Sequence, residues 1–143
     1  MLKTILPNII TTIGAFILVY LSVIKEIFVT KNSLIRERLD KFYFPFYSLY
    51  CKNLISKVPL FEHNADVRLA FIELMADNVH YMSPNAQALF PDFFAVNIKL
   101  TTTPRLDESS RSIVFAVFEN FFDITIADYK KLLKKAKLPV PKI

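Results

Sequence analysis

The 143-residue chain is 53% hydrophobic and has a formal net charge of +5 at neutral pH. Its single glycine, Gly14, excludes glycine-rich phosphate loops and argues against β-sandwiches and barrels, whose tight turns need residues at positive φ. Its single cysteine, Cys51, excludes an internal disulfide and a multi-cysteine metal site. These limits favour an all-α fold.

The first predicted element is a membrane-spanning helix. From Ile5 to Ile24 twenty residues carry no charge, and as a helix they extend about 30 Å, the thickness of a bilayer's hydrocarbon core. A cleaved secretory signal and a buried core helix are the alternatives, but no small-residue cleavage site follows the run, which passes directly into Lys25. We therefore predict that residues 1–31 are a transmembrane signal anchor. Its lipid-facing positions include Ile5, Ile13, Phe16, Leu18, Leu21 and Ile24.

The basic residues that flank this span predict its orientation. Only Lys3 and the amino terminus precede it, whereas five basic residues follow it closely: Lys25, Lys31, Arg36, Arg38 and Lys41. Basic flanks remain on the cytoplasmic side of a membrane. The sequence therefore predicts a single-pass protein of the cell inner (cytoplasmic) membrane, with membrane lipid around its N-terminal helix. Residues 32–143 are expected to form a helical cytoplasmic domain.

A dense aromatic segment follows the anchor. No glycine or proline occurs between Gly14 and Pro45, so the membrane helix is expected to continue toward residue 44, unless Ser33 caps a new helix. Pro45 should kink or end this helix, and Cys51 is expected to be a small buried hydrophobe. The segment is interpreted either as the core of a bundle or as a partner-binding surface or interfacial belt. Its aromatic members are Phe42, Tyr43, Phe44, Phe46, Tyr47 and Tyr50.

Further helices are predicted from their start signals. Asn64 should cap a helix that runs to about residue 81, and Ser83 followed by proline should begin the next, which Pro91 bends. Residues 107–109 offer acidic and capping side chains for another helix, and a final helix is expected from Ala127. Alternating apolar residues predict a possible minor β-hairpin near 95–103 and 124–126.

Residue types that carry chemistry are scattered. The only histidines, His63 and His80, are seventeen residues apart and belong to no tight metal-ligand motif. Glu73 and Asp77 share a helical face, but the apolar stripe uses other positions, so solvated charges are the favoured interpretation. We predict no catalytic residue, no metal site and no cofactor, and hence a chain that is not an enzyme.

The C-terminal segment is the most distinctive charged feature. Residues 32–129 hold nine basic and twelve acidic side chains, whereas residues 130–143 hold six lysines and no acid. This basic amphipathic helix fits a solvated final helix, a contact with anionic lipid, or an acidic partner, with nucleic acid disfavoured. The candidate lipid-contact residues are Lys130, Lys131, Lys134, Lys135 and Lys137.

The segment from Arg38 to Tyr47, placed after an N-terminal anchor, resembles small uncharacterised bacterial single-pass membrane proteins that share a lysine–aromatic–proline–aromatic–tyrosine pattern. The resemblance covers about residues 1–80 and implies an anchor and a helical cytoplasmic domain, without an activity or catalytic residues. We therefore expect a membrane-anchored, non-enzymatic interaction or scaffold module that binds a cytoplasmic partner or itself as an oligomer. The alternative is a membrane-perturbing oligomeric effector or toxin, for example in phage defence.

Overall fold

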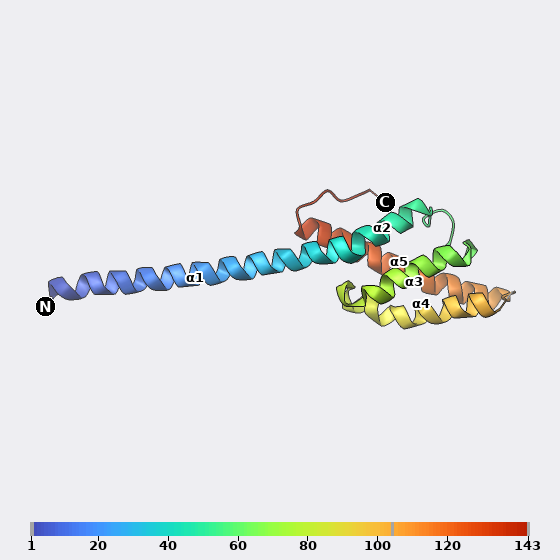
Figure 1. The fold of residues 1–143 in the computed structure, drawn as a ribbon, viewed down its shortest axis with the longest axis horizontal. Coiled ribbons are helices and arrows are strands. Elements are labelled where there is room, and N and C mark those ends of the chain that lie inside the picture. The colour runs from blue at the N-terminus through green and yellow to red at the C-terminus, as the bar shows by residue number, and fades with distance from the viewer. Residues whose placement is uncertain (1, 104, 143) are drawn as a thin grey trace. The chain divides into compact units, whose positions relative to one another are not determined.

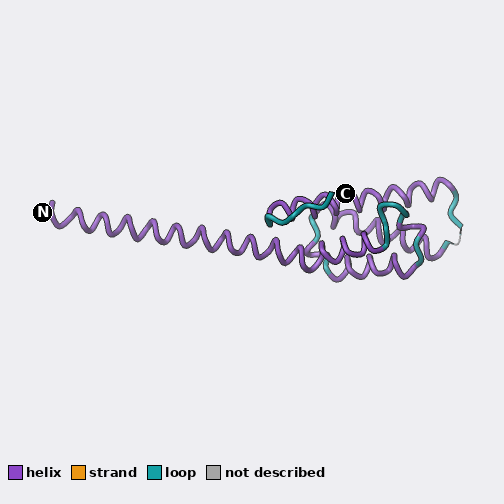
Figure 2. Tube along the Cα trace, turned by 90° about the horizontal axis from the view of Figure 1, so that it is seen from above, coloured by secondary structure: helices purple, strands orange, loops and turns teal. Residues whose placement is uncertain are grey.

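The computed structural model describes residues 2–103 and 105–142, with only the helical backbone for residues 2–12. The α-helices are α1 (Leu2–Arg38), α2 (Phe44–Lys52), α3 (Ala65–Asp77), α4 (Pro84–Thr102) and α5 (Glu108–Lys135) (Figure 1). A π-helix, Leu39–Tyr43, precedes α2, and short 3-10 helices span Leu60–Glu62 and Val79–Tyr81. The described residues contain helix and loop but no strand (Figure 2), which confirms the all-α class.

The chain divides into two compact units, Met1–Leu34 and Ile35–Ile143. In the first unit, helix α1 continues past Ser33, as expected from the absence of glycine and proline, and the alternative of a new helix capped by Ser33 is wrong. No glycine or proline interrupts this part of α1, and a single serine in an exposed helix costs too little to end it. From Ile13 onward nearly every side chain of this unit is exposed. The first unit contains the most apolar part of the described chain.

In the second unit, the π-helix shows how the chain accommodates Pro45. The backbone N–H of Phe44 donates to the carbonyl of Leu39, five residues back, where an α-helix would bond four back. Pro45 then falls in the first turn of α2, where its missing N–H needs no partner. The helical stretch therefore continues from α1 through the π-helix into α2, and Pro45 does not end it.

Three N-terminal caps follow the sequence prediction. Asn64 accepts a hydrogen bond from the backbone N–H of Val67 at the start of α3, and Ser83 accepts one from Ala86 at the start of α4. Asp107 caps α5 by accepting from the N–H of Ser110. Each cap satisfies one of the donors that a helix start leaves without an internal partner.

Two sequence predictions are wrong. Residues 95–102 belong to α4 and residues 124–126 to α5, so there is no hairpin at these positions. The apolar residues there also satisfy helical spacing, with Val96 and Leu100 four apart and packed against the core. The helix expected from Ala127 is the second half of α5, because no glycine or proline separates it from the segment before.

The core of the second unit is built mainly from phenylalanine. Helices α4 and α5 pack against each other, and α2 and α3 complete the bundle. Phe93 lies 4.7 Å from Phe118 and 4.8 Å from Phe121 between ring centroids. Phe46 of α2 contacts Phe71 and Phe122 at 5.5 and 5.7 Å. Burying such rings supplies the largest apolar area per side chain available to a small domain.

Candidate functional site

The aromatic segment lies largely in the core. Phe42, Tyr43 and Phe46 are fully buried, while Tyr47 and Tyr50 are half-buried and Phe44 is exposed. Tyr43 stacks on Tyr129 of α5 at 6.4 Å. The bundle-core interpretation therefore describes most of this cluster, and the residues free to contact a ligand or partner are at its margin.

Arg38 organises one end of this cluster. Its Nε donates to the carbonyl of Tyr81 at 2.8 Å, and its guanidinium lies 5.8 Å from the centre of the Tyr43 ring. Burial is the main cause of the raised pKa of Tyr43, and the Arg38 charge opposes that rise. Arg38 is thus a packing and hydrogen-bonding residue of the domain.

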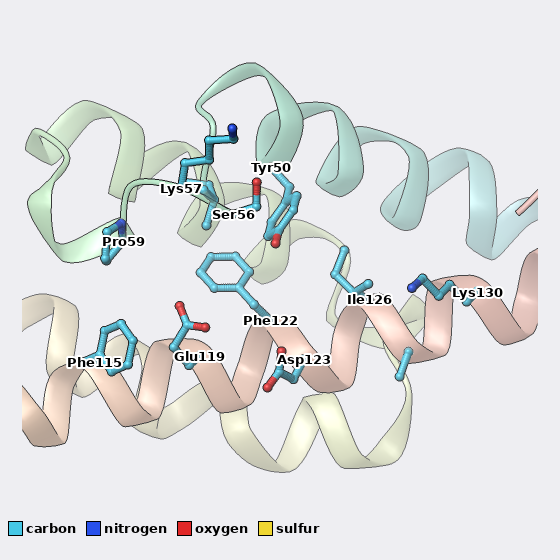
Figure 3. A pocket seen from close by; sticks show the side chains of 12 residues that line it. Tyr50, Ser56, Lys57, Pro59, Phe115, Glu119, Phe122, Asp123, Ile126 and Lys130 are labelled. Carbon is cyan, nitrogen blue, oxygen red and sulfur yellow. The ribbon is translucent and has the colours of Figure 1, made fainter. Parts of the chain in front are cut away.

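The principal pocket lies between residues 50–59 and α5 (Figure 3). It encloses about 490 Å³, within the range of small-ligand sites. Tyr50 and Phe122 meet at its centre with ring centroids 5.7 Å apart, and Phe115 lies farther along the same helix (Figure 3). Two carboxylates on α5, Glu119 and Asp123, and two lysines, Lys57 and Lys130, also line it.

The pocket perturbs the titration of the Glu119 carboxyl. Burial raises the pKa of the Glu119 carboxyl, and the neighbouring Asp123 raises it further. Burial, followed by Glu119 and Asp123, also raises the pKa of the Tyr50 phenol. The pocket therefore combines aromatic surface with two acidic and two basic side chains, a lining suited to a side chain that has both apolar and polar parts. Sequence reasoning missed the pair Glu119 and Asp123, although their spacing of four residues on a helix next to Phe115 and Phe122 was a visible signal.

The predicted span residues are on the surface of the first unit. Ile13, Phe16, Leu18, Leu21 and Ile24 are all exposed, and the side chain of Ile5 lies outside the described residues. One helical stretch of the described chain, Ile13–Lys52, is long and apolar enough to cross a membrane. Its most apolar window has a mean hydropathy of 1.9 and no buried residue.

The lysines of the C-terminal segment differ in their exposure because one face of α5 packs against the core. Of the candidate lipid-contact lysines, Lys130 is half-buried and lines the pocket, whereas four are exposed: Lys131, Lys134, Lys135 and Lys137. Tyr129, Leu132 and Leu133 point into the core from the same helix. The segment is therefore a docked amphipathic helix end with an exposed basic face.

Cys51 corrects a sequence prediction because it is exposed, not buried. It lies in the last turn of α2, where Phe46 supplies the buried face. A hydrogen bond with Cys51 is the main reason that the pKa of Tyr47 rises to about 12. Glu73, Asp77 and His80 are exposed, and no three metal-ligating side chains cluster within the described ranges.

Comparisons with known proteins give no match to a family model, a curated protein or a solved structure.

Proposed function

We propose that this chain is a single-pass membrane protein that holds a non-enzymatic, helical interaction domain at the cytoplasmic face of the cell membrane. The observation that carries the proposal is the exposed apolar surface of α1 between Ile13 and Ile24. A helix of a soluble core buries one face, but here large apolar side chains are exposed all round the helix.

The energetics favour lipid around this helix. Each Ile, Leu, Val or Phe at a helix centre favours membrane insertion by about 0.3 to 0.6 kcal/mol. The described part of the span contains many such residues and no charge before Lys25, so insertion is favoured by several kcal/mol. The basic residues after the span support a cytoplasmic location for the second unit.

An interaction role is supported by the pocket between α5 and residues 50–59. Its aromatic walls, with two acidic and two basic side chains around them, offer a surface for a side chain of another protein or of a second copy. Phe115, which is 42% exposed, extends the apolar surface beyond the pocket. The described lining residues include no histidine, and the aromatic side chains that dominate the walls favour binding as the use of this pocket.

The anchor is tested by alkaline carbonate extraction and protease accessibility of the full chain in vesicles. We expect the wild type to remain in the membrane fraction, with the domain cleaved only from the cytoplasmic side. The double substitution Leu18→Lys and Leu21→Lys should release the chain, since each lysine costs about 2.5 to 3.5 kcal/mol at a span centre. Ile113→Lys, at an exposed position of α5, is the matched control. Release of the wild type by carbonate contradicts the anchor.

Partner binding is tested with a photo-crosslinking amino acid at Phe115, at native expression level in cells. We expect one defined adduct, with a cytoplasmic protein or a second copy, identified by mass spectrometry. The control places the same crosslinker at Leu69, an exposed residue of α3 outside the pocket. A ladder of large self-adducts accompanied by loss of membrane potential favours the oligomeric effector. Equal adducts from both positions contradict the proposed surface.

A further inference from the structure

A second pocket in the domain is lined by three arginines. It encloses about 490 Å³ between α3, α4 and the start of α5. Arg68 comes from α3, Arg105 from the connection between α4 and α5, and Arg111 from the first turns of α5. No carboxylate is among the lining residues, which are Phe61, Arg68, Leu100, Thr103, Arg105, Leu106 and Arg111.

Arg68 is the unusual member of this set because it is only 8% exposed. Its Nε donates to Oδ1 of Asn97 at 3.1 Å, and its Nη1 donates to the carbonyl of His63. Both acceptors are neutral, and burial lowers the pKa of Arg68. These bonds fix the guanidinium in place and leave its other amino group for a ligand.

Arg111 is oriented by an aromatic ring. Its guanidinium carbon lies 5.7 Å from the centre of the Phe61 ring, and Phe61 in turn packs edge-on against Phe115. The carboxylate of Asp107, which caps α5, accepts a hydrogen bond from the backbone N–H of Ser110. Hydrogen bonds with Ser110 are the main cause of its lowered pKa, and the charge of Lys99 lowers the pKa further. The positive charge that faces the pocket is therefore not neutralised from within its lining.

We infer that this pocket binds a phosphate monoester whose organic part is apolar. Guanidinium groups form paired hydrogen bonds to phosphate oxygens, and a phosphate monoester carries about −1.5 to −2 charges at neutral pH, closer than a single carboxylate to the charge of three arginines. Phe61, Leu100 and Leu106 offer apolar walls, and the volume exceeds what one phosphate group fills. The inference is independent of the partner surface proposed above.

The test is isothermal titration calorimetry of the full chain in phosphatidylcholine nanodiscs, with phenyl phosphate as the probe and benzoate at equal ionic strength as its carboxylate counterpart. We expect saturable binding of phenyl phosphate, at least about tenfold tighter than benzoate. Arg105→Gln and Arg111→Gln should each weaken it about tenfold, the effect of losing one charge-assisted hydrogen bond. Arg36→Gln, at an exposed site outside the pocket, should change nothing. Arg105 is exposed, so its variant keeps the fold.

The phosphate could belong to a lipid headgroup or to a soluble monoester. Nanodiscs that contain phosphatidic acid distinguish the two, and nanodiscs with phosphatidylserine are the control for lipid charge. A drop in phenyl phosphate affinity with phosphatidic acid alone supports the site and assigns it to a lipid headgroup. Unchanged affinity supports the site and assigns it to a soluble monoester. No binding of phenyl phosphate in phosphatidylcholine, benzoate of equal affinity, or an equal loss with Arg36→Gln overturns the inference.

Discussion

The hydroxyl of Tyr81 donates a hydrogen bond to Oε1 of Glu37 at 2.7 Å, across 44 residues of chain. The neighbouring Arg38 bonds the carbonyl of the same tyrosine at 2.8 Å. The last turn of α1 is thus tied to the connection between α3 and α4 at two adjacent positions.

These two hydrogen bonds should differ in their contribution to the free energy of unfolding. Arg38→Ala removes the bond to Tyr81 and the contact with the Tyr43 ring, so we expect the free energy of unfolding to fall by about 1 to 2 kcal/mol. Tyr81→Phe removes only the bond to Glu37, which is solvent-exposed, and should change much less. Chemical denaturation of the full chain in detergent, followed by tyrosine circular dichroism, measures both. Equal losses would contradict this ranking.

Adjacent phenylalanines in α4 provide a matched pair for the core. Phe93 is fully buried against Phe118 and Phe121, whereas Phe94 is 44% exposed. Phe93→Ala should lower the free energy of unfolding by about 3 to 5 kcal/mol through lost burial and a cavity. Phe94→Ala should lower it by less than about 0.5 kcal/mol. The same denaturation experiment applies, and a larger loss at Phe94 would place the core on the other face of α4.

Thr125 offers a stabilising substitution. It is fully buried, and its hydroxyl oxygen has no hydrogen-bond partner. Thr125→Val keeps the shape and removes the unsatisfied group, so we expect about 1 kcal/mol of added stability. Thr125→Ser keeps the hydroxyl and removes a methyl group, and should lose about 1 kcal/mol. Thermal unfolding that ranks serine above valine would show that the hydroxyl is satisfied in solution.

The raised pKa of Glu119 predicts a pH dependence. The folded domain holds the proton of Glu119 more tightly than the unfolded chain does. The stability that this proton contributes is therefore complete below the ordinary pKa of 4.5 and is lost as pH rises through the folded-state pKa. Glu119→Gln should therefore gain stability relative to wild type as pH increases above about 4.5. Denaturation midpoints from acidic to neutral pH measure the difference. Glu108→Gln, at an exposed position, is the control, and parallel curves for Glu119→Gln and wild type would refute the shift.

Local features of the fold were predictable from the sequence. The caps at Asn64, Ser83 and Asp107 depend on residues within three positions, so the pattern contains all the information that they need. The start assigned at Ala127 was wrong because Asp123 and Thr125 resemble capping residues in sequence. In the structure Thr125 is buried inside a continuous α5 and caps nothing.

The sites depend on distant contacts, and the sequence did not reveal them. Arg68 and Arg111 are 43 positions apart and meet only because α3 and the start of α5 border the same pocket. Cys51 was expected inside because free cysteine is usually buried, yet its exposure depends on which face of the short α2 meets the core. Packing direction of this kind is set by tertiary contacts, which periodicity over nine residues specifies weakly.

The π-helix at Leu39–Tyr43 acts as a one-residue insertion between two stretches of regular helix. One residue corresponds to about 100° of rotation around a helix. If the same residues formed a regular α-helix throughout, Phe46 would turn by this angle away from Phe71. The wide turn therefore sets the phase of α2, so that the apolar faces before and after it are directed to the same core.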